Sequence, residues 1–131
     1  KPGSPLSLRS NILTHDADRY ADEVYWWQAR PDIRLGPPSW HWVERAIAST
    51  RALNEPGILE AIRTPVLMLA TRADRLVDTN RIERDAKRLP DCELLLFGKE
   101  AAHELLREAD PVRNRCIEAI MAFFDCRAPR S

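Results

Sequence analysis

Two side chains that can share a proton follow two apolar runs in the second half of this 131-residue sequence. Asp74 lies four residues beyond the run VLMLA at 66–70, and His103 lies six residues beyond the run LLLF at 94–97. A carboxylate that accepts the Nδ1 proton of an imidazole fixes its tautomer and leaves Nε2 free to act as a base. Asp74 and His103 could therefore be the acid and base of a nucleophilic relay.

This chemistry requires the two apolar runs to be neighbouring strands. Continuous apolar runs such as 66–70 and 93–97 are typical of strands buried on both faces, and a helical pattern at about 80–89 lies between them. Strand, helix, strand and helix with short links predict a β-α-β unit with parallel strands and a right-handed crossover. The carboxyl ends of such strands lie about 4.8 Å apart at one edge of the sheet. We therefore expect the loops to bring Asp74 to His103.

A last helix is predicted to begin at Asp110-Pro111, with Asp110 as its N-cap. Its apolar stripe comprises Val112, Cys116, Ile117, Ile120, Phe123 and Phe124. Two strands do not make a stable sheet by themselves, so we expect this unit to be the edge of a larger sheet. The chain also starts at Lys1 without a methionine, and we expect it to be part of a longer chain.

The first half has a different character, because residues 1–60 hold all four tryptophans and no convincing strand. Thr14 is predicted to be the N-cap of a helix that runs to about Arg30. A proline-rich loop follows, and Ser39 is predicted to cap a second helix at about 40–53.

Composition narrows the classes of function. The net charge is zero, with 20 basic and 20 acidic residues, so nothing indicates a nucleic-acid or anionic-membrane partner. No apolar run approaches the roughly 18 residues that span a bilayer, and no signal peptide is evident. The three cysteines lack metal-ligand spacing, so we expect reduced thiols, no metal and no cofactor. We expect a cytoplasmic protein, with peripheral contact at the inner face of the membrane as a second possibility.

Several longer motifs resemble a known family. TPVLMLATRADRLVD at 64–78, LLLFGKEAAHELLREADPVR at 94–113 and a closing helix that ends in AFFD resemble the C-terminal part of α/β-hydrolases. The likeness is greatest to the lysophospholipase L2 and monoacylglycerol lipase group. LTHDADRY and RLGPPSWHWV resemble the cap segment of bacterial lysophospholipases. The resemblance covers roughly residues 11 to 125.

This resemblance implies a fold and a site. The fold class would be α/β, the C-terminal part of an α/β-hydrolase, with residues 1–60 as a helical cap and residues 61–131 as the β-α-β-α part of the core. Asp74 would be the acid of a Ser-His-Asp triad and His103 its base. The helices of residues 14–54 would form a lid over an acyl-chain pocket.

One part of the family pattern is missing. The nucleophile of this family is the serine of G-x-S-x-G, but none of the four glycines here is followed by a serine two residues later. We therefore expect the serine to lie outside this chain and the 131 residues alone to be inactive.

Several polar residues could have more than one role. Asp78 is a rival acid, but an aspartate or threonine before a helix, as at Asp78 and Thr79, is more often a cap. Five further side chains are open to interpretation: Glu104 and Glu108 either support the site or are merely solvated, Arg113 pairs with Glu108 or Asp110, and His15 and His41 lie on polar faces.

Four tryptophans cannot all face one small core. Their apolar area suits either packing within the cap or a lipid-chain site. Trp26 and Trp40 lie off the apolar helix stripes, so we expect these two to contact the substrate.

Two functions from different classes remain. The first is the C-terminal fragment of a serine hydrolase that cleaves carboxylic esters of lipids, either lysophospholipids or monoacylglycerols. The second is a non-catalytic α/β module that binds an apolar ligand or self-associates through an exposed sheet edge.

Overall fold

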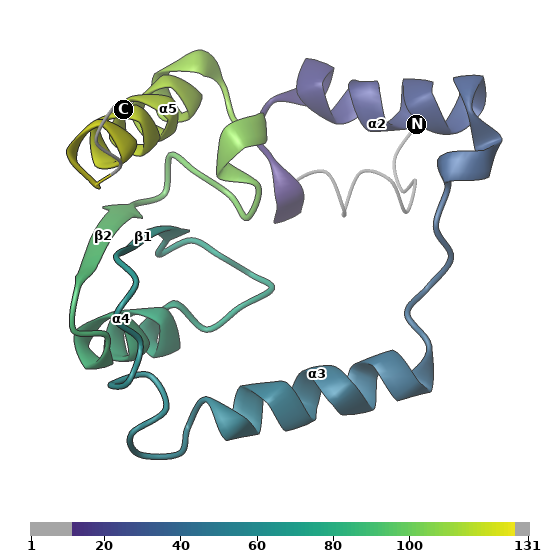
Figure 1. Ribbon diagram of the computed structural model, residues 1–131. Coiled ribbons are helices and arrows are strands. Elements are labelled where there is room, and N and C mark those ends of the chain that lie inside the picture. The colour runs from purple at the N-terminus through teal and green to yellow at the C-terminus, as the bar shows by residue number, and fades with distance from the viewer. Residues whose placement is uncertain (1–11, 128–131) are drawn as a thin grey trace.

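The computed structural model describes residues 12–127. Its helices and strands follow a helical first half and an alternating second half (Figure 1). In chain order they are α2 (Ala17–Ala29), the 3₁₀ turn η1 (Pro31–Ile33), α3 (Trp40–Ala52), β1 (Val66–Thr71), α4 (Thr79–Arg88), β2 (Cys92–Phe97), the 3₁₀ turn η2 (Leu105–Arg107) and α5 (Asp110–Arg127).

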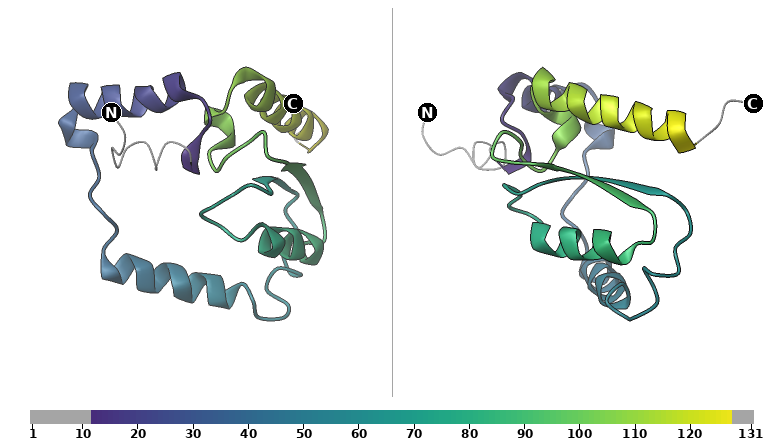
Figure 2. Two further views of the ribbon diagram at one scale, coloured as in Figure 1. Left: turned by 180° about the vertical axis from the view of Figure 1, so that it is seen from behind. Right: turned by 90° about the vertical axis from the view of Figure 1, so that its left-hand side faces the viewer.

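The two strands pair as predicted. β1 and β2 are parallel, in a register that runs from Val66 opposite Cys92 to Thr71 opposite Phe97. Helices α4 and α5 lie on opposite faces of this pair (Figures 1 and 2). This is the layered arrangement of an α/β fold, and it confirms the predicted fold class.

Burial of the strands is less complete than predicted. Only Ala70 and Thr71 of β1 and Phe97 of β2 are buried, and the other strand residues are partly or fully exposed. The reason is that, among residues 12–127, the sheet has these two strands alone, so both outer edges lack a neighbour.

The core lies between β2, η2 and α5. It consists of Phe97, Ala101, Leu105, Val112 and Cys116, with Leu69 and Leu95 packed against them. The predicted stripe of α5 is therefore correct at its first two positions. Ile117 and Phe124 of this stripe are exposed, although the end of α5 still reaches the sheet, where Arg127 binds Glu93 of β2.

Of the four predicted N-caps, Ser39 and Asp78 are confirmed, whereas Thr14 and Asp110 are wrong, because Asp110 already lies within α5. Ser39 caps α3 by accepting the N–H of Trp42, and Asp78 caps α4 by accepting that of Asn80. Helix α2 is capped by Asp16 rather than Thr14. The hydroxyl of Thr14 instead donates to the carbonyl oxygen of Arg107, 2.7 Å away.

The helices of the first half, α2 and α3, do not pack closely against the sheet. No residue of α3 is buried, and Figure 1 shows this helix at the opposite side of the molecule from α5. Within residues 12–127, the helices are all too short or too polar to span a bilayer. The division between cap and core at residue 60 stays a prediction.

Candidate active site

Asp74 stands in the turn that leaves the carboxyl end of β1. Its Oδ1 accepts the backbone N–H groups of Leu76, at 2.8 Å, and Val77, at 3.1 Å. This local pattern, in which an aspartate accepts from the chain two and three residues ahead, is a common way to stabilise a turn. It fixes the carboxylate and leaves Oδ2 available.

His103 binds that second oxygen of Asp74. Its Nδ1 lies 2.8 Å from Asp74 Oδ2, so the contact predicted from the two strand ends is present. The Asp74 side chain is only 6% exposed and that of His103 34%. The buried partner is therefore the carboxylate, and the imidazole has one side open to solvent.

The charge state of Asp74 decides what this contact can do. Burial works to raise its pKa, but the hydrogen bonds from His103, Leu76 and Val77 outweigh burial and lower the pKa below its ordinary value. An ionised carboxylate only accepts hydrogen bonds, so the shared proton lies on His103 Nδ1. Nε2 then carries a lone pair and can take a proton from a nucleophile.

Thr71, the last residue of β1, ties the two loops together. Its hydroxyl is buried and lies 2.8 Å from the carbonyl oxygen of Gly98 and 2.9 Å from that of Ala101, while it accepts the N–H of Ala73. The hydroxyl thus links the turn before Asp74 to the loop before His103.

Glu108 is buried and is therefore not a solvated surface residue. Its carboxylate is 1% exposed and accepts the backbone N–H of Ala102 at 2.6 Å and that of His15 at 3.1 Å. His15 Nδ1 lies 3.1 Å from the same carboxylate. His15 is itself half exposed, as a polar surface residue is expected to be, and its ring also contacts this buried carboxylate.

Among residues 12–127, Asp78, Arg113 and His41 make no hydrogen bond or ion pair with Asp74 or His103, although Asp78 lines the same small cavity as Asp74. Asp78 caps α4 and does not contact His103. The pairing predicted for Arg113, with Glu108 or Asp110, is made by Arg19 instead, which binds the carbonyl oxygen of the first and the carboxylate of the second. His41 is exposed and lies 3.9 Å from Glu44.

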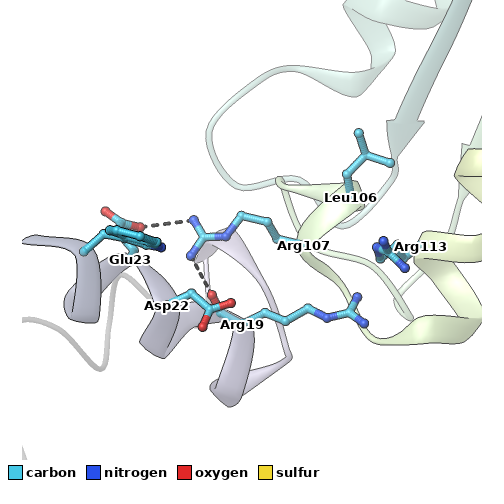
Figure 3. A pocket seen from close by; sticks show the side chains of 7 residues that line it. Arg19, Asp22, Glu23, Leu106, Arg107 and Arg113 are labelled. Carbon is cyan, nitrogen blue, oxygen red and sulfur yellow. Dashed lines mark hydrogen bonds and ion pairs between the residues drawn. The ribbon is translucent and has the colours of Figure 1, made fainter. Parts of the chain in front are cut away.

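A cavity of about 580 Å³ lies between α2 and the start of α5. Figure 3 shows Arg107 extending from η2 toward Glu23 of α2, and these side chains are 3.1 Å apart. Trp26 is 53% exposed and is one of the lining residues. The mixed charges on this wall suit a polar surface rather than an acyl chain.

Trp40 lies elsewhere. It is 90% exposed at the start of α3 and lines a shallow apolar depression with Val43 and Ile47. The structure does not bring Trp26 and Trp40 to one wall, and contact of either with substrate stays a prediction. Within the part of the chain that the structure describes, no cluster of His, Cys, Asp and Glu could hold a metal ion.

Comparison with known proteins decides the family. The family described as "Serine aminopeptidase, S33" matches residues 2–110. The chain belongs to this family of hydrolases. It is 32% identical, over 132 aligned positions, to lysophospholipase L2 of Escherichia coli K12, and 29% identical over 100 positions to a probable lysophospholipase L2 of Haemophilus influenzae.

These matches cover most of this chain but only a small part of each relative. They cover 92% and 75% of this chain but only 36% and 30% of the two relatives, so the chain spans about a third of their length. The chain is also similar to a crystal structure of a soluble variant of monoglyceride lipase from Saccharomyces cerevisiae in complex with a substrate analogue. The match covers 98% of this chain and 42% of the lipase chain. With a TM-score of 0.75 at 19% identity, it shows that the fold is that of an α/β-hydrolase.

The sequence offered Glu108 as a residue that could support the site, but it did not reveal the contact of Glu108 with His15. They are 93 positions apart, and no local pattern connects them. The one signal in the sequence is a glutamate that follows His103 by five residues, in a stretch where charged residues are common.

Proposed function

We propose that this chain supplies the acid, Asp74, and the base, His103, of a serine hydrolase that cleaves carboxylic esters of lipids. The observation that carries the proposal is the 2.8 Å contact between His103 Nδ1 and a buried Asp74 carboxylate at the carboxyl ends of two parallel strands. The names of the relatives, lysophospholipase and monoglyceride lipase, support a lysophospholipid or a monoacylglycerol as the substrate.

The serine of this triad would come from the part of the protein outside this chain. It would attack the ester carbonyl while His103 Nε2 takes its proton, and the imidazolium would return that proton to the leaving alcohol. Water would then hydrolyse the acyl-enzyme, with His103 again as the base. Asp74 keeps the ring in the correct tautomer and stabilises its positive charge.

The test uses the full-length protein that contains this chain. Turnover of a soluble nitrophenyl ester, a lysophospholipid and a monoacylglycerol is measured for the wild type and for His103→Ala and Asp74→Asn. Loss of either residue should lower kcat about 10⁴-fold, as expected for members of a triad.

Asp78→Asn is the matched control, because Asp78 is a nearby aspartate that caps a helix and does not touch His103. Its kcat should stay within about twofold of the wild type, since it lacks a contact with the reacting groups. Turnover by His103→Ala close to that of the wild type would exclude the proposed role.

A further inference from the structure

Two segments that are distant in the chain, the residues around His15 and the loop that carries His103, meet at the buried carboxylate of Glu108. Ala102, which precedes His103, donates its N–H at 2.6 Å. His15, which begins the approach to α2, donates its N–H and places Nδ1 at 3.1 Å. The backbone oxygen of Glu108 accepts from Arg19 of α2.

The loop that carries His103 also has backbone bonds to the residues just before His15. The N–H of His103 donates to the carbonyl oxygen of Ile12 at 3.3 Å, and that of Glu104 donates to Leu13 at 2.8 Å. The segment that accepts these bonds is itself held at His15 by Glu108. The Glu108 carboxylate therefore holds both the His103 loop and the segment of residues 12–15 against which this loop packs.

Resting on the function proposed above, we propose that Glu108 is a positioning residue, which holds the His103 loop against the start of the cap segment so that the imidazole stays in place on Asp74. It reaches His103 only through Ala102 and touches no reacting atom. Because the same carboxylate binds His15, displacement of the cap segment also loosens the loop that carries the base.

The chemistry of a carboxylate suits this role. Its two oxygens accept the two backbone N–H groups and face the His15 ring together, whereas a glutamine side chain has one acceptor oxygen. A carboxylate that is 1% exposed must satisfy its oxygens internally. A shift of about 1 Å in a catalytic group can lower turnover by about 10²-fold, so partial loss of these bonds should be visible in kcat.

The test compares Glu108→Gln with Glu104→Gln in the full-length protein. Glu104 is the matched control, because it belongs to the same loop but pairs with Arg107 instead. Glu108→Gln should lower kcat at least about 10-fold, with KM within about twofold. The NMR signal of the Nδ1 proton of His103 should move upfield or broaden, whereas Glu104→Gln should leave kcat and this signal unchanged.

A second measurement uses the wild-type protein, so that it does not depend on whether the Glu108→Gln variant folds. If Glu108 fastens both segments, hydrogen exchange at the Ala102 and His15 amides should report one shared opening. Independent exchange of these amides, or wild-type kcat and an unchanged His103 signal in Glu108→Gln, would overturn the proposal. These outcomes differ from failure of the proposed function, in which His103→Ala itself would retain turnover.

Discussion

At the scale of single residues, the state of Asp74 determines what the site can do. The carboxylate is buried against His103, yet hydrogen bonds to the ring and to two backbone N–H groups keep its pKa below the ordinary value. An acid that stays ionised can stabilise an imidazolium, and this is the role that a triad requires.

The same shift predicts how stability depends on pH. A carboxyl whose pKa is lower in the folded protein contributes stability that is complete above its unfolded pKa of about 3.9 and is lost as the pH falls through the folded value. Urea unfolding should therefore show a difference between the wild type and Asp74→Asn that shrinks between about pH 5 and about pH 3. A difference that stays constant over this range would contradict the assignment of the bonds to an ionised Asp74.

At the scale of elements, helix caps and contacts set by strand pairing were largely predictable, whereas other long-range contacts were not. Ser39 and Asp78 cap their helices as expected, because a cap depends on residues two or three positions ahead. Thr14 failed as a cap because its hydroxyl is bound to Arg107, 93 residues away. The contact between Asp74 and His103 was predictable since parallel strands bring their carboxyl ends together, but no such rule links Glu108 to His15.

Arg88 shows how one side chain can join two elements. From α4 it binds the Glu60 carboxylate at 2.8 Å and the carbonyl oxygens of Leu53 and Glu55, each at 2.8 Å. The guanidinium is the main cause that lowers the pKa of Glu60 to about 2. The segment between α3 and β1 is thus attached to α4 by a planar fork of donors.

A lysine cannot reproduce that fork. Arg88→Lys should therefore speed hydrogen exchange at the Ala61 and Ile62 amides by about tenfold, because the bound segment opens more readily. Arg84→Lys is the control, since Arg84 is on the same helix but is 61% exposed and 3.8 Å from its partner Asp78. Equal exchange in the two variants would show that Arg88 does not hold this segment.

At the scale of the whole molecule, the half-exposed sheet indicates that other structure must cover it. Further strands of a longer protein and a second copy of this chain are the two candidates. The match to 42% of a complete α/β-hydrolase chain favours the first. The contact of residues 12–15 with the His103 loop also fits a site completed by the remainder of such a protein.

We propose that His103 activates a serine that lies outside residues 1–131. The most direct measurement is the rate at which a fluorophosphonate labels the full-length protein, with the modified serine located by peptide mapping. We expect one labelled serine in a G-x-S-x-G sequence outside this chain, and labelling at least about 10³-fold slower in His103→Ala. Equal rates in the two proteins, or a labelled serine within this chain, would contradict it.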